Sequence, residues 1–224
     1  MGIKVDLKIF IFIIIICLMK KIEIYVMLMS FALIHELAHL ASGILVGFKP
    51  ESIKISPYGF SINFKTNCKD YNTKIKKSNL LSLKKILIAL SGPAINILIA
   101  IVLFLFCKVK SVNSIIGIRV EPMIYSNILL FLFNLIPIYP LDGGRILKEL
   151  IHINMGLEKS YYITNEISNI SIIILTIASS FLILIYHNII IVFIIAYLWT
   201  LIIINNKNVK KIKKIITIHN LYKI

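Results

Sequence analysis

Long apolar blocks separated by short polar or basic segments dominate the chain. Six apolar stretches follow one another, at 5–19, 24–46, 86–107, 122–140, 166–186 and 189–204. A helix needs about 20 residues to cross the hydrocarbon core of a bilayer. The pattern therefore predicts an all-α polytopic membrane protein with about six transmembrane helices. The first stretch is short for a span, and only His187–Asn188 separates the last two, which indicates a hairpin of helices.

The long polar segment between the second and third stretches has a different pattern. In ESIKISPYGFSINF (51–64), apolar and polar residues alternate on both sides of Pro57–Tyr58–Gly59. This pattern predicts a small β-hairpin between helices 2 and 3. One hypothesis is that its edge holds an extended substrate through backbone hydrogen bonds. The alternative is a hairpin that only closes the cytosolic mouth of the protein.

Composition and charge support the membrane class and set an orientation. The chain is 58% hydrophobic and carries a net charge of +15. Both termini are predicted in the cytosol, because 20 of the 25 basic residues then face inward. We expect a membrane domain over 1–204 and a basic cytosolic tail over 205–224 that attracts anionic lipid. No nucleic-acid motif is found, so no nucleic acid is expected as a partner.

Two histidines and a glutamate interrupt the second apolar stretch in HELAH (35–39). His35 and His39 are four residues apart, so they share one face of a helix and can bind one zinc ion. Glu36 can act as general base toward a water molecule on that metal. The alternative is a pair of core histidines bonded to their neighbours. It leaves an ionisable Glu36 at membrane depth unexplained.

A catalytic zinc site usually needs a third protein ligand. The chain has three aspartates, of which Asp6 precedes the first helix and Asp70 lies in a lysine-rich loop. Asp142 follows the fourth apolar stretch, which runs toward the cytosol as the second does. Two prolines, Pro137 and Pro140, break that helix, so we expect the chain to run extended toward the metal. These considerations favour Asp142 as the third ligand.

Three motifs in this order carry a resemblance to a known family. HELAH (35–39), SGPAIN (91–96) and NLIPIYPLDGGR (134–145) on six apolar segments resemble the site-2 protease family of intramembrane zinc metalloproteases. The resemblance covers most of the chain. It implies a zinc metalloendopeptidase that cleaves a membrane-associated protein within or near the bilayer.

The resemblance also implies roles for particular residues. One zinc ion per chain would be held by His35, His39 and Asp142, with Glu36 as the catalytic base. Asn134 and Pro140 would contribute to substrate binding or to transition-state support.

The compact layout resembles the branch of the family that acts in sporulation. That branch implies a pro-sigma factor as substrate, inhibitory membrane proteins as partners and the mother-cell membrane around the forespore as the location. Otherwise the location is the cell membrane. The chain is expected to differ from this branch in having no nucleotide-binding CBS domain after its last helix. It also shows no PDZ insertion of the kind found in the members of the family that act in envelope stress.

Several alternatives stay open from the residues alone. Another class of membrane zinc protease would use a glutamate as third ligand, either Glu149 or Glu166. Two histidines and a carboxylate also suit non-haem iron. A metal transporter or an inactive scaffold is the non-enzymatic reading. In SGPAIN, a structural role is favoured over a catalytic one, with Asn96 bonding across helices.

Overall fold

The computed structural model describes residues 2–5, 22–56, 59–64, 75–110, 114–115, 118–186 and 189–221. The chain divides into two compact units, Met1–Asn134 and Leu135–Ile224. The expected division at 204 falls inside the last helix, which continues to Leu221. The helix therefore continues from the predicted membrane domain into the predicted basic tail without a break at 204. The division between the two stays a prediction.

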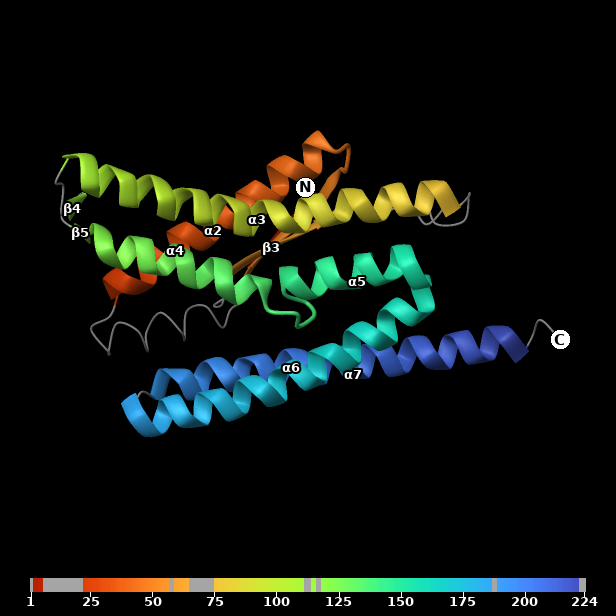
Figure 1. Cartoon of the computed structure of the whole chain (residues 1–224). Coiled ribbons are helices and arrows are strands. Elements are labelled where there is room, and N and C mark those ends of the chain that lie inside the picture. Colours follow the sequence, from red (N-terminus) through yellow and green to blue (C-terminus); the bar gives the residue numbers. More distant parts are fainter. Residues whose placement is uncertain are drawn as a thin grey trace. The chain divides into compact units, whose positions relative to one another are not determined.

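Two long helices form the frame of the first unit (Figure 1). Helix α2 (Ile22–Leu45) packs against α3 (Ile75–Lys110) in antiparallel fashion. A short antiparallel ribbon, β4 (Ser114–Ile115) and β5 (Ile118–Arg119), leads from α3 into α4 (Val120–Leu135). Contacts between α2 and α3 join residues about 50 positions apart, and they include the histidine-bearing face of α2.

A three-stranded sheet completes the first unit. Its order is β1 (Gly2–Val5), β2 (Pro50–Ser56) and β3 (Gly59–Phe64). Strand β2 pairs in parallel with β1 and antiparallel with β3. Both sides of β2 are therefore occupied, and β3 is the edge strand of the β2–β3 pair. The hypothesis of strand addition by a substrate must accordingly be directed to β3.

Three helices form the second unit (Figure 1), namely α5 (Asp142–Met155), α6 (Leu157–Tyr186) and α7 (Ile189–Leu221). Helix α5 packs on α6, and α6 packs antiparallel to α7. The α6–α7 seam combines buried aliphatic side chains with polar pairs. Asn205 Nδ2 donates to Asn165 Oδ1 at 2.8 Å, and Trp199 Nε1 donates to Thr176 Oγ1 at 3.1 Å. Hydrogen bonds of this kind join helices in lipid, where hydrophobic driving force is lacking.

The sequence did not predict α5. Its sequence DGGRILKELIHINM mixes polar and apolar residues, so it forms no apolar block. Its residues have the periodicity of an amphipathic helix, and α5 packs against α6. The expected fourth stretch, 122–140, was also too long, because α4 ends at Leu135, two residues before Pro137.

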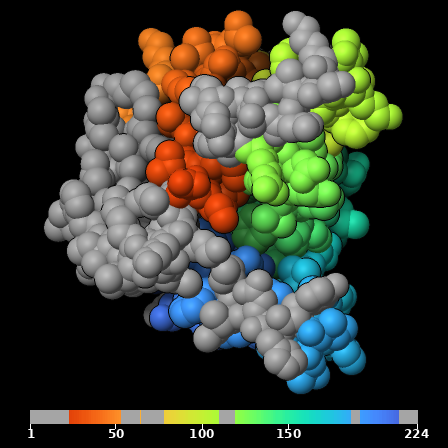
Figure 2. Space-filling view, turned by 90° about the vertical axis from the view of Figure 1, so that its left-hand side faces the viewer, coloured from red at the N-terminus to blue at the C-terminus, as the bar shows by residue number. Residues whose placement is uncertain are grey.

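Within the described ranges, four helices are long and apolar enough to cross a membrane. They are Glu23–Leu45, Ser78–Val109, Leu157–Ile185 and Ile191–Lys213. The apolar helix α4 has only 16 residues. Most of the expected first stretch, 5–19, lies outside the described residues. Many large apolar side chains of these helices are exposed, and α2 reaches the surface in Figure 2, where its atoms are red to orange. The chain is therefore an integral membrane protein.

Candidate metal centre

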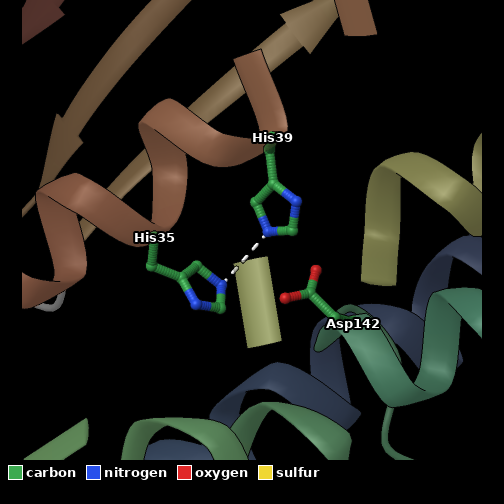
Figure 3. A group of neighbouring side chains, drawn as sticks. All are labelled: His35, His39 and Asp142. Atoms are coloured by element: carbon green, nitrogen blue, oxygen red, sulfur yellow. Dashed lines mark hydrogen bonds between the residues drawn. The ribbon is translucent and has the colours of Figure 1, made fainter. Parts of the chain in front are cut away.

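The two histidines of HELAH converge on one face of α2. Their side chains are only 4% and 3% exposed, and their Nε2 atoms lie 3.1 Å apart (Figure 3). The rings meet edge to face, with centroids 4.7 Å apart. A spacing of four residues places both on consecutive turns of the helix. The convergence of the two Nε2 atoms is the arrangement that binding of one metal ion by both rings requires.

The backbone of α3 orients the second histidine. His39 Nδ1 lies 2.6 Å from the carbonyl oxygen of Ile88. A carbonyl oxygen can only accept, so Nδ1 carries a proton, and in the neutral imidazole Nε2 then keeps its lone pair. Ser91 Oγ, which donates to the same carbonyl at 2.7 Å, lies 3.3 Å from Nδ1. Metal-binding histidines generally show this outer arrangement, which fixes the tautomer and the ring orientation.

Gly92 on α3 keeps space in front of the histidines. A Cβ atom at this position would lie 2.5 Å from Nε2 of His35 and 2.5 Å from Nε2 of His39. Any other residue would occupy the space that faces both ligand atoms. For the SGPAIN motif, which contains Gly92, the sequence predicted only a structural role. Its position against the histidines could not be predicted without the register of α2 against α3.

Asn96 lies one turn further along α3 and is completely buried. Its amide nitrogen and oxygen have no hydrogen-bond partner in the described part of the chain. The expected hydrogen bond from Asn96 across helices is therefore not observed. A buried amide without a partner costs about 1–3 kcal/mol, so such groups are uncommon in folded proteins.

Glu36 follows His35 on α2 and is partly accessible, whereas both histidines are buried. A general base must reach water, and this exposure suits that role. The assignment of Glu36 as the base stays a prediction.

The second unit holds Asp142 in the first turn of α5 (Figure 3). The residue is 4% exposed, and its carboxylate lies 3.6 Å from the guanidinium of Arg145. A helix N-terminus favours a negative charge. Asp142 is therefore a buried carboxylate that has a cation beside it and a helix N-terminus behind it.

A compact turn, not an extended segment, leads to Asp142. Ile138 N donates to Ile136 O at 2.7 Å, and Leu141 N donates to Ile138 O at 2.8 Å. The backbone N–H of Tyr139 donates to Ser168 Oγ on α6 at 3.1 Å. The expected extended run was wrong, because the two prolines end α4 and the chain then folds back on itself.

Gly143 and Gly144 make this turn possible. A Cβ at Gly143 would lie 2.2 Å from the carbonyl oxygen of Leu135. A Cβ at Gly144 would lie 2.4 Å from the backbone carbon of Ile138. The Asp-Gly-Gly sequence therefore lets the first turn of α5 lie directly against the preceding backbone.

The remaining predicted residues have the following places. Asn134 Nδ2 donates to Leu130 O within α4 at 3.0 Å, and Pro140 lies half-buried in the turn after a cis peptide bond. Their roles stay predictions. Of the two alternative ligands, Glu149 is buried and its Oε2 lies 3.6 Å from His152 Nδ1, while Glu166 is exposed on α6. Glu149 thus has a histidine partner of its own.

Comparison with known proteins finds a family model that matches part of the chain, two curated relatives and a solved structure. Peptidase family M50 matches residues 108–178. The chain is 30% identical over 148 residues to "Zinc metalloprotease MJ0392" of Methanocaldococcus jannaschii, covering 64% of this chain and 39% of that protein. It is 22% identical over 134 residues to "Stage IV sporulation protein FB" of Bacillus subtilis, covering 60% and 42%. The chain thus spans about two fifths of the length of these curated relatives.

A solved structure has the same fold. The "Site-2 Protease from Methanocaldococcus jannaschii" superposes with a TM-score of 0.64, at 23% identity, over 89% of this chain and 88% of that one. The resemblance to the M50 or site-2 protease family that the three motifs predicted is thereby confirmed.

Proposed function

We propose that the chain is an intramembrane zinc metalloendopeptidase that hydrolyses a peptide bond of a membrane-associated protein. The observation that carries this proposal is the pair of buried histidines with converging Nε2 atoms. Gly92 keeps the space in front of them open. The zinc metalloprotease named among the relatives supports the same activity.

The donor set fits zinc. His35, His39 and Asp142 offer two imidazole nitrogens and one carboxylate oxygen, and all three side chains are buried. Three protein ligands with one open position are typical of catalytic zinc. A bound zinc ion would supply Lewis-acid activation of water and of the substrate carbonyl. Non-haem iron is less suited, because Glu36 directly after the first histidine is a general base of hydrolytic sites.

The protein's own side chains would carry the proton transfers. Glu36 would take a proton from the attacking water and pass it to the leaving amine. His39 would keep its orientation through the Nδ1 hydrogen bond to Ile88. Asn134 uses one amide hydrogen in its bond to Leu130, which leaves the second one available to a developing oxyanion. Pro140 would contribute to binding the substrate beside Asp142.

Orientation, substrate and location follow from charge and relatedness. Both termini would face the cytosol, since 20 of the 25 basic residues then do. The relative named as a sporulation protein supports a pro-sigma factor as substrate and the mother-cell membrane as location. The edge strand β3 would hold the substrate extended. Inhibitory membrane proteins and anionic lipid would be further partners.

The test is Glu36→Gln in the purified chain reconstituted in vesicles. The variant should keep its zinc and lose proteolysis of the membrane protein that accumulates uncleaved when the gene is inactivated. Glu23→Gln is the matched control, since it removes an exposed carboxylate from the first turn of the same helix. Undiminished cleavage by Glu36→Gln would refute the proposal. Zinc transport into vesicles by both variants, without cleavage by the wild type, would favour the transporter.

A further inference from the structure

A cavity of about 380 Å³ lies within the second unit, and none of the proposed metal ligands is among the residues that line it. It is lined by six polar side chains from the turn before α5 and from α5, α6 and α7, namely Tyr139, Lys148, Tyr161, Asn205, Asn208 and Lys211. Two aliphatic side chains of α7 complete the lining. The proposed protease function gives this cavity no role.

The lining is cationic and rich in hydrogen-bond donors. Its two lysines come from different helices, Lys148 from α5 and Lys211 from α7. No acidic residue occurs among the described residues that line the cavity. The tyrosine hydroxyls and asparagine amides are further donors. Such a lining favours an anion with several acceptor oxygens.

Aromatic rings hold one of these lysines in place. The ammonium of Lys148 lies 3.6 Å from the ring centroid of Tyr161 and 5.2 Å from that of Tyr139. Cation–π contacts at these distances stabilise an ammonium group and restrict its movement. The Lys148 side chain is therefore already ordered at the cavity. It loses less conformational entropy when an anion binds.

The cavity lies at one end of the apolar part of the second unit. Its α7 residues fall between Asn205 and Ile212, directly after the apolar stretch of this helix that ends at Ile204. Its α6 residue, Tyr161, lies near the beginning of the other apolar helix, Leu157–Ile185. In a bilayer, the end of an apolar span lies close to the phospholipid headgroups. The buried Val209 and half-buried Ile212 give the cavity an apolar side as well.

We propose that this cavity binds a phosphate group, supplied by the headgroup of an anionic phospholipid. The oxygens of one phosphate can accept from two ammonium groups and from tyrosine hydroxyls at once, as charge-assisted hydrogen bonds. Free phosphate offers the same chemistry and is the second source to distinguish. This site differs from the general attraction of the basic tail to a charged membrane, because it depends on two particular lysines.

The experiment is native mass spectrometry of the full chain in detergent, with added phosphatidylglycerol or, separately, phosphatidylcholine. The double variant Lys148→Gln/Lys211→Gln removes the lining charges. The matched control is Lys207→Gln/Lys210→Gln, which removes two exposed charges from the same basic segment of α7 without touching the cavity. Lys148→Arg/Lys211→Arg keeps the charges. A competition series adds inorganic phosphate to the wild type.

The wild type should retain phosphatidylglycerol in preference to phosphatidylcholine. Removing the lining charges should weaken this binding by about tenfold or more, equivalent to about 1.4 kcal/mol. The matched control and the arginine variant should bind as the wild type does. If Lys148→Gln prevents folding, the single variant Lys211→Gln is used instead, because Lys211 is exposed. It should lose part of the phosphatidylglycerol binding.

Two other outcomes are informative. Binding of inorganic phosphate that depends on both lysines, without lipid preference, would support the phosphate site and identify a soluble source. Equal loss in the lining and control double variants would overturn the proposal, because the attraction would then be a general property of the basic helix. Unchanged binding in the lining double variant would overturn it as well.

Discussion

The two units hold their proposed metal ligands in different ways. His35 and His39 stand on a long membrane helix, and a neighbouring long helix presses its backbone carbonyl and a glycine against them. Asp142 instead begins a short amphipathic helix after a compact turn. The first arrangement depends on the register between two regular helices. The second depends on the shape of six residues between α4 and α5.

This difference predicts different responses to mutation. Around Gly92 the nearest atoms belong to imidazole rings, which can rotate by a small amount. Around Gly143 and Gly144 the nearest atoms are backbone atoms of the preceding turn, which cannot move without changing the turn. We therefore expect a side chain added at Gly143 or Gly144 to destabilise the fold. A side chain added at Gly92 should weaken metal binding more selectively.

The largest effect is expected from removing a ligand. His35→Ala, His39→Ala and Asp142→Ala should each reduce zinc affinity by about a hundredfold or more, since a four-coordinate site loses one of three protein ligands. Zinc content of the purified variants, measured by mass spectrometry, is the readout. Glu149→Ala is the control, because this buried carboxylate faces His152. Full zinc content in Asp142→Ala, with loss in Glu149→Ala, would transfer the ligand to the glutamate.

A second, smaller effect should follow from Gly144→Ala. The added methyl would lie 2.4 Å from backbone atoms of Ile138 and Tyr139. Overpacking of this kind costs about 1–3 kcal/mol. Thermal unfolding in detergent should therefore shift downward, together with zinc affinity. Arg145→Ala, at the next and exposed position, should leave the unfolding temperature nearly unchanged. Equal stability of both variants would show that the turn is less rigid than its contacts indicate.

Gly92→Ala should separate metal binding from folding. Its methyl would approach both Nε2 atoms to 2.5 Å, and the rings would have to turn away. We expect zinc affinity to fall about tenfold, the lower end of the range for disturbed ligand orientation. The unfolding temperature should change less than in Gly144→Ala. Ala94→Leu, which enlarges an exposed side chain on the same helix, should alter neither. Normal zinc affinity in Gly92→Ala would contradict the role of this glycine.

The smallest effect is expected from Ser91→Ala. The hydroxyl of Ser91 lies 3.3 Å from His39 Nδ1, but the Ile88 carbonyl at 2.6 Å remains in place. Zinc affinity should fall only about two- to threefold, below the usual effect of losing an outer partner. Ser126→Ala, which removes a hydroxyl bonded within α4, is the control. A loss as large as that of a ligand variant would mean that the serine, and not the carbonyl, orients the ring.

The features predicted correctly are those encoded locally. Apolar length located the long helices, and a spacing of four placed His35 and His39 on one face. The features that were missed depend on distant contacts. Helix α5 is stabilised by packing on α6, and its sequence has no apolar block. Strand β1 pairs with β2 across about 50 residues, which no local pattern of either segment indicates. The role of Gly92 likewise needs the register between two helices.

The bond between His39 and the Ile88 carbonyl has a consequence for sequence variation. Every residue at position 88 supplies the same carbonyl, so no single substitution there deletes the acceptor. Position 88 should therefore tolerate Leu, Val or Met without loss of ring orientation, although it contacts the metal centre through its backbone. In a comparison of natural variants, position 88 would be variable, whereas Gly92, one helical turn away, would be restricted to glycine. A partner built from the main chain is hidden from any method that infers function from side-chain identity.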